Sequence, residues 1–390
     1  MSVADEINQL NAGWYNVVNR ALDITNPNFQ LAQGTLGLQT SDSSGLFLML
    51  DAVPPSAAVH YYDPSGLSKR SSAYQGMLNA LTPEQAADLR TVLSDQYAAW
   101  IAYKNDFFIA NPTSDKTQED LFTLFANQRL DPGKAAQALT VYKQNANNRL
   151  NQALDALHAP AATQAFVGSD GTSFSLYRYS ATIDGAKNAI LTGGGPTQIS
   201  YDSSTADTTL RHTTVKGAAS GFWDIFSGGA GGGFDQLNTT AASSRFTVSG
   251  TINKFATLAA SPIEWFSSNE YSRAYNGNGD ANIWNPLANV GNWDSFFKQP
   301  DGSLARRVTS LLLVSGYDIT VTSHASYSTQ DYQQITTEAS FGIWPFFSAE
   351  VSTTHTTNFT HNEDGTLTIK HTLGEGLIEI WGVFVAEAPN

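Results

Sequence analysis

Three histidines near the C-terminus, His355, His361 and His371, are the first candidates for chemistry in this sequence. Imidazole nitrogens on adjoining strands can act as ligands of one metal ion. His355 and His361, however, lie six residues apart, which is roughly 20 Å along a strand, so they cannot bind one ion together. No acidic residue joins them at close spacing. We therefore predict that these histidines bond to threonine hydroxyls and that the protein uses no metal and no other cofactor.

The relative positions of the histidines follow from a turn predicted at 362–366. Its sequence, Asn-Glu-Asp-Gly-Thr, matches a type I turn with glycine at the left-handed bulge position. In the resulting register His361 faces Leu367, and Thr357 faces His371. One face of this hairpin then carries its apolar residues, and the other carries hydroxyl and amide groups.

Other catalytic signatures are incomplete. The stretch 276–280 places oxygen ligands at alternate positions, as a calcium loop does, but Ala281 and Leu287 stand where that loop needs Gly and Glu. The sequence contains no nucleophile elbow and no phosphate-binding glycine loop after a strand. Carboxylates such as Glu264 and Glu270 could converge in a cleft, but nothing in the sequence selects them. We therefore expect a non-enzymatic protein.

Two aromatic islands carry the strongest functional signal. One, 221–226, runs into the glycine cluster 228–233, and the other, 341–347, interrupts a stretch rich in Ser and Thr. Trp and Phe beside flexible glycines can lie at a bilayer interface, where the ring is apolar and the indole N–H stays hydrated. The same rings could instead be buried in a β-sandwich, as large aromatics mostly are. The predicted membrane-contact or partner-contact residues are Phe222, Trp223, Phe226, Phe341, Trp344, Phe346 and Phe347.

The second island lies within 326–361, whose arms 326–340 and 348–361 alternate hydroxyl or amide residues with larger ones. This alternation predicts a long amphipathic hairpin with an apolar tip. A strand of a transmembrane barrel needs only about 9–11 such residues. The pattern resembles the β-hairpin pore-forming proteins of the aerolysin type, over roughly a tenth of the chain. That resemblance implies that hairpins from several protomers join into a barrel.

The elements that must position these segments divide into two regions. Residues 1–165 predict a mainly helical domain and residues 166–390 an antiparallel β-rich domain, so the expected fold class is α+β. Apolar residues at helical spacing predict two long antiparallel helices over 83–110 and 132–158. The apolar run 46–50 reads as a strand or an irregular segment.

Composition excludes several classes of function. With 35 acidic and 21 basic residues the net charge is -14, which repels nucleic-acid phosphates and anionic lipids. The sequence has no cysteine, which removes disulfides and thiolate metal sites. Asp5 and Glu6 stand where a signal peptide carries positive charge, and the apolar residues of 1–20 recur at helical spacing, which predicts a helix there. We therefore expect synthesis in the cytoplasm without a Sec signal, with any release following a non-classical route.

Together these features predict a protein that binds a neutral membrane surface, a glycan or a protein receptor and associates with copies of itself. A β-hairpin pore-forming toxin is the most specific form of this hypothesis. The alternative is a self-assembling structural protein, in which strands and aromatic islands make the contacts between subunits. A glycan-acting hydrolase is the third hypothesis. Leakage of liposomes would separate the first from the other two.

Overall fold

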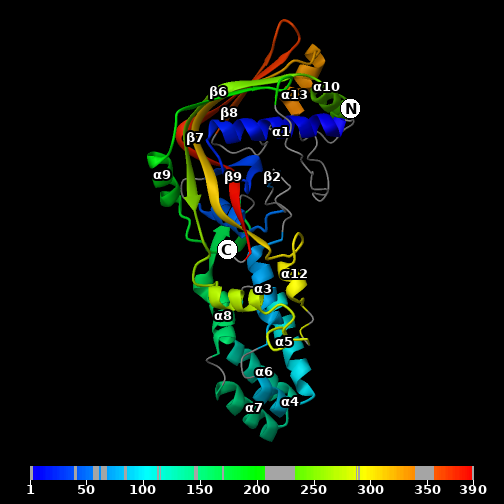
Figure 1. Cartoon of the computed structure of the whole chain (residues 1–390), viewed down its shortest axis with the longest axis vertical. Helices are drawn as coiled ribbons and strands as arrows, with labels where there is room; N and C mark the ends of the chain where they lie inside the picture. Colours follow the sequence, from blue (N-terminus) through cyan, green and yellow to red (C-terminus); the bar gives the residue numbers. More distant parts are fainter. Residues whose placement is uncertain are drawn as a thin grey trace.

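The computed structural model shows an elongated α+β protein, with a curved sheet at one end and a group of helices at the other (Figure 1). The predicted fold class is confirmed. The structure describes residues 3–38, 42–55, 61–62, 68–82, 86–111, 114, 116–144, 148–168, 171–206, 233–286, 288, 290–338 and 355–388.

One large sheet forms the upper half of the molecule in Figure 1. Its strand order is β2-β1-β9-β7-β6-β5, and β8 also pairs with β9. All neighbours are antiparallel except β1 and β2. The strands are β1 (Phe29–Leu38), β2 (Tyr61–Tyr62), β5 (Thr197–Asp202), β6 (Phe246–Ala259), β7 (Arg306–Ser323), β8 (His355–His361) and β9 (Leu367–Glu387).

The hairpin of β8 and β9 has the register that its turn predicts. His361 pairs with Leu367, and Thr357 pairs with His371. Gly365 has a φ of 81°, and its N–H donates to the Asn362 carbonyl over 2.9 Å. Local turn chemistry therefore fixed this pairing.

The long strands β7 and β9 are not in continuous register. Tyr317 pairs with Leu373, whereas Ser315 pairs with Ile378. Residues 374–377 of β9 consequently form a bulge, which bends and twists a sheet locally. In Figure 1 the long strands curve over helix α1.

Three helices lie against this curved part of the sheet and share one core with it: α1 (Val3–Ala21), α10 (Gly233–Ala242) and α13 (Thr329–Glu338). The apolar spacing of the first twenty residues predicts α1, and the structure confirms it. Its Leu10, Trp14 and Val18 are buried one to two turns apart. Trp14 packs against Trp381 of β9, with ring centroids 6.3 Å apart.

The opposite end of the molecule is helical, and both predicted long helices are divided there. Ser94 adopts a φ of 53° between α4 and α5, and Asn148 caps α8 by accepting a hydrogen bond from Asn151 N–H. The prediction of unbroken helices was wrong because the apolar residues keep helical spacing across both breaks. The helices are α4 (Ala86–Leu93), α5 (Gln96–Ala110), α6 (Gln118–Arg129), α7 (Pro132–Gln144) and α8 (Arg149–His158).

The middle of the molecule joins these two ends. Residues 46–50, expected as a strand or an irregular segment, belong to helix α2. That expectation failed because the run is apolar on nearly every side, so it shows neither period clearly. The remaining elements are α2 (Ser44–Asp51), α3 (Arg70–Ala80), the 3-10 turn η1 (Pro160–Ala162), β3 (Thr163–Val167), β4 (Ser173–Tyr177), α9 (Ile183–Thr192), α11 (Ser268–Asn276) and α12 (Trp293–Phe297).

Residues from the first 165 positions also enter the large sheet. Phe29 of β1 pairs with Phe384 of β9, so the sheet combines the two ends of the chain. The division into domains at residue 165 stays a prediction.

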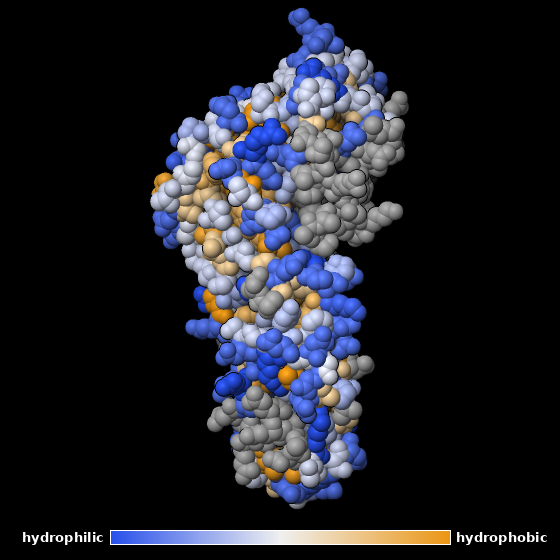
Figure 2. All heavy atoms as spheres, in the orientation of Figure 1, coloured by the Kyte–Doolittle hydropathy of each residue, from blue (hydrophilic) through white to orange (hydrophobic). Residues whose placement is uncertain are grey.

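Figure 2 shows a mainly hydrophilic surface over the lower helices and hydrophobic residues gathered beside the upper sheet. Leu191 of α9 is 74% exposed.

Candidate functional site

The predicted contact residues fall in two connections between strands of the large sheet. Phe222, Trp223 and Phe226 lie in the connection 203–245 between β5 and β6, and the other four lie in the connection 324–354 between β7 and β8. All seven are outside the described residues, so their role stays a prediction. The described parts of both connections show where these segments leave the sheet.

Both connections leave the sheet at one strand-end junction, formed by the ends of β5, β6 and β7. Phe246, the first residue of β6, pairs with Ser323, the last residue of β7. The next residue, His324, donates its N–H to the Arg245 carbonyl over 2.9 Å. On the other side Phe246 N–H donates to Ser203 Oγ over 2.8 Å. The backbone bond from His324 to Arg245 therefore ties the two connections to each other.

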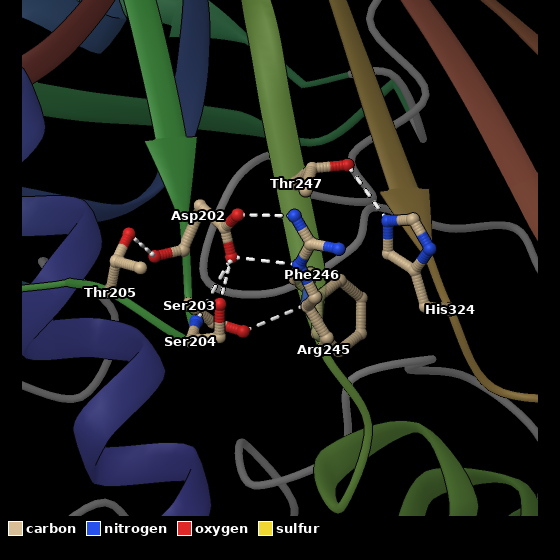
Figure 3. A network of polar contacts seen from close by, with 8 residues as sticks. All are labelled: Asp202, Ser203, Ser204, Thr205, Arg245, Phe246, Thr247 and His324. Atoms are coloured by element: carbon tan, nitrogen blue, oxygen red, sulfur yellow. Dashed lines mark hydrogen bonds and ion pairs between the residues drawn. The ribbon is translucent and has the colours of Figure 1, made fainter.

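At this junction an ion pair joins the last residue of β5 to the residue before β6 (Figure 3). Arg245 Nε donates to Asp202 Oδ1 over 2.9 Å, and Arg245 Nη2 pairs with Asp202 Oδ2. Ser204 donates to the same carboxylate through its N–H and its hydroxyl, over 3.0 and 2.7 Å. The bonds from Arg245, followed by those from Ser204, hold the pKa of the Asp202 carboxyl well below its usual range. The pair is partly exposed, so solvent and salt screen it.

Replacing Asp202 with Asn should destabilise the protein modestly at neutral pH. Because the folded pKa is depressed, the stabilisation is present above the ordinary carboxyl pKa of about 4 and is lost as pH falls through the folded value. The difference in free energy of unfolding between wild type and variant should stay constant from about pH 7 to 5 and shrink below about pH 4. Urea unfolding across this range measures it.

Asp106→Asn supplies a matched control, because Asp106 is an exposed residue of α5. It should show no comparable loss at neutral pH. A stability difference for Asp202→Asn that grew on acidification would contradict the assigned ion pair.

The first arm of the predicted long hairpin is a helix, not a strand. Residues 329–338 form α13, so the prediction for 326–340 was wrong over that range. A capping box starts the helix: Asp331 N–H donates to Ser328 Oγ over 3.1 Å, and Ser328 N–H donates to Asp331 Oδ2 over 2.8 Å. This Ser-x-x-Asp signal is present in the sequence, but the hydroxyl alternation around it favoured a strand.

The helical part of each connection is docked on the same core. Leu237 and Ala241 of α10 are buried, and so is Ile335 of α13. All three belong to one hydrophobic cluster together with Trp14 of α1. Figure 1 places α10 and α13 near each other at the top of the molecule, over the end of α1. Both connections thus pack amphipathic helices against the sheet they leave.

The candidate metal and catalytic residues have structural partners. His371 Nδ1 lies 2.8 Å from Thr357 Oγ1, as predicted. The prediction of a threonine partner was wrong for His361, whose Nε2 lies 2.8 Å from the Tyr327 carbonyl, because the segment before α13 packs against this end of β8. Buried Glu270 forms an ion pair with Arg273 at 2.7 Å. Within the described part of the chain, no three His, Asp or Glu residues cluster as metal ligands would.

The junction residues Asp202, Arg245 and His324 were missed by the sequence analysis. Asp202 and Arg245 are 43 positions apart, so no local spacing marks them. Only the pairing of β5 with β6 brings them together.

Comparison with protein-family models, with curated proteins and with solved structures finds no match for this chain. None of the helices that the structure describes has the length and apolar character needed to cross a membrane. The function must therefore be argued from the site itself.

Proposed function

We propose that this protein is a non-enzymatic membrane-binding protein that self-associates and inserts β-hairpins into a neutral bilayer. One observation carries the proposal. The two connections that hold the aromatic islands leave neighbouring strands at the same end of one antiparallel sheet. A hairpin extended from β5 and β6 would leave the sheet beside the end of β7, where the second connection starts. The second connection rejoins the sheet at His355, which pairs with Leu373 level with Tyr317, so its segments would have to rearrange to enter a membrane beside that hairpin.

The first connection suits extension because β5 and β6 are antiparallel neighbours. Their pairing ends at Asp202 with Thr247, and the connection begins with the next residue. New strand residues on both sides would continue the same register without breaking an existing ladder bond. The range 203–245 holds more than the roughly 20 residues that two bilayer-crossing strands need.

The second connection leads into β8, whose described residues have the pattern of an amphipathic strand. Thr356, Asn358 and Thr360 are exposed, while the residues between them, Thr357 and Phe359, are half-buried. Such alternation lets one face of a strand meet water and the other meet lipid. The net charge of -14 favours neutral headgroups over anionic ones.

Self-association is supported by two strands of the upper sheet that have only one described neighbour each. Among the described strands, β5 pairs only with β6 and β8 pairs only with β9. An edge strand presents unpaired N–H and carbonyl groups that another copy can complete. A closed ring of such sheets would leave no edge.

The decisive experiment is dye release from liposomes of neutral lipid. Wild type should release the dye, and the double variant Trp344→Ser, Phe346→Ser should lose at least nine-tenths of this activity, since the apolar groups for interface binding would be gone. Its thermal unfolding should change little. A matched control is Phe174→Ser, Leu191→Ser, two exposed hydrophobic residues on β4 and α9, which should keep the release.

Two results together would end the proposal. One is the absence of leakage from every neutral lipid composition tried. The other is unfolding of the double variant, because truncation of buried aromatics costs roughly 3–5 kcal/mol each.

The same edge strands also favour a second candidate, a self-assembling structural protein. This candidate predicts large assemblies in the absence of lipid, detectable by light scattering. The membrane proposal predicts that assembly depends on lipid.

A further inference from the structure

The connection between β6 and β7 forms an open pocket at the opposite end of these strands from the junction. It has a volume of about 670 Å³, within the range of about 300–1,000 Å³ typical of small-molecule sites. Two indole rings and several amide and carboxylate side chains line it. The aromatic and polar lining residues are Asn278, Asp280, Trp284, Asn285, Asn292, Trp293 and Asp294.

The two tryptophans are held firmly by the surrounding aromatic core. Trp284 stacks on Phe296, with ring centroids 5.8 Å apart and planes 16° apart. Trp293 donates its indole N–H to the Tyr275 carbonyl over 2.7 Å and packs on Phe297. Because these contacts fix both rings, a ligand would lose little affinity in ordering them.

The backbone of the pocket is fixed as well. Leu81, just after α3, forms a β-bridge with Trp284. Thr82 N–H donates to the Ile283 carbonyl over 2.7 Å, and Asn285 N–H donates to the Ala80 carbonyl over 2.8 Å. These bonds attach the loop to the end of α3, so the pocket is largely preformed.

The polar groups keep bonding capacity for a ligand. Asp280 Oδ1 accepts from Asn282 N–H over 2.8 Å, and Asp294 Oδ2 accepts from Lys298 Nζ over 2.9 Å. A carboxylate has about four acceptor positions, so both can accept further bonds. Amides such as that of Asn278 both donate and accept.

The described lining residues include no Lys, Arg or His. Lys298 balances the charge of Asp294 from outside the lining, so Asp280 is the carboxylate that disfavours an anion. Neutral ligands with many hydroxyl groups fit this environment best. Their O–H groups can donate to the carboxylates, and their C–H faces can pack on the partly exposed ring of Trp293, whose π-face is negative. We propose that this pocket binds a neutral carbohydrate. The proposal does not depend on the proposed membrane insertion, because the pocket involves neither connection.

Calorimetric titration of the full-length protein with neutral oligosaccharides tests the pocket. The probes are chitotriose in its N-acetylated form, cellotriose, maltotriose and lactose. We expect saturable binding of at least one of them. Trp293→Ala and Asp294→Asn should each weaken it at least tenfold, whereas Asp184→Asn, whose side chain is 92% exposed on α9, should leave it unchanged.

Asp294→Asn keeps the test valid if loss of the Trp293 ring disturbs folding, because Asp294 is an exposed residue whose size is preserved. A sulfated form of the bound sugar should bind more weakly, owing to the Asp280 carboxylate. Absence of saturable binding across the panel would overturn the proposal. So would binding that both pocket variants retain. Neither result bears on dye release from sugar-free liposomes, which tests the proposed function separately.

Discussion

Replacing Lys104 with Met is expected to raise the free energy of unfolding at pH 7 by up to about 3 kcal/mol. Lys104 lies on α5 and is 4% exposed. Burial lowers the pKa of its ammonium group to about 8, because the charged form loses its hydration. Methionine fills a similar volume without a charge to desolvate.

The pH dependence identifies the cause. Between pH 8 and about 10.4 the unfolded chain keeps the lysine proton while the folded protein has lost it, so wild-type stability rises with pH in this window. Below pH 8 the cost of burying the charge is fully present. The advantage of Lys104→Met should therefore be largest at pH 7 and shrink towards pH 10.

Denaturant unfolding at pH 7, 8, 9 and 10 measures this difference. Lys134→Met is the control, since the Lys134 side chain is 34% exposed and lies 3.9 Å from Asp95. It should show no such trend. A difference for Lys104→Met that is constant with pH, or a variant less stable at every pH, would refute the assignment.

Sequence reasoning succeeded where the signal was local. The turn at 362–366 determined the pairing of β8 with β9 residue by residue, because glycine at a left-handed position and the flanking polar residues specify one loop length. The helical spacing of α1 was readable for the same reason. Its buried residues, such as Leu10, Trp14 and Val18, recur every four positions.

Sequence reasoning failed where two local signals in the same segment favoured different structures. The hydroxyl-rich range 326–340 has the alternation of a strand, but the Ser328 and Asp331 capping box and burial of Ile335 favour helix α13. The break at Ser94 was missed because one residue with positive φ does not disturb the spacing of the apolar residues around it.

The candidate sites were mostly beyond sequence reasoning because they join distant positions. Asp202 meets Arg245 only through strand pairing. The sequence 276–280 resembles part of a calcium loop, and its residues 278–280 line the pocket together with Trp284 and Trp293. The sequence could not predict this grouping, because it depends on how the whole connection between β6 and β7 folds. Such contacts are set by tertiary packing.

The proposed function predicts an unusual effect for Ile335→Ala in α13. If both connections extend into the membrane, α13 must first leave the core on which it is docked. Ile335 is fully buried there, and its truncation should cost roughly 2–5 kcal/mol. This loss weakens the docked state of α13, so less free energy is needed to undock it. A loss of 1.4 kcal/mol corresponds to a factor of ten, so the variant should release dye from neutral liposomes at least tenfold faster than wild type.

Ile319→Ala is the matched control. Ile319 is equally buried in the same core cluster, but it belongs to β7, which keeps its pairing in the proposed extension. Both variants should unfold at lower temperature, and only Ile335→Ala should accelerate release when both are measured well below their unfolding temperatures. Equal effects of the two variants, or slower release by Ile335→Ala, would mean that α13 is a fixed part of the fold. Faster release by Ile335→Ala, with release by Ile319→Ala unchanged, would identify undocking of α13 as the step that limits insertion. General destabilisation of the fold would accelerate release by both variants.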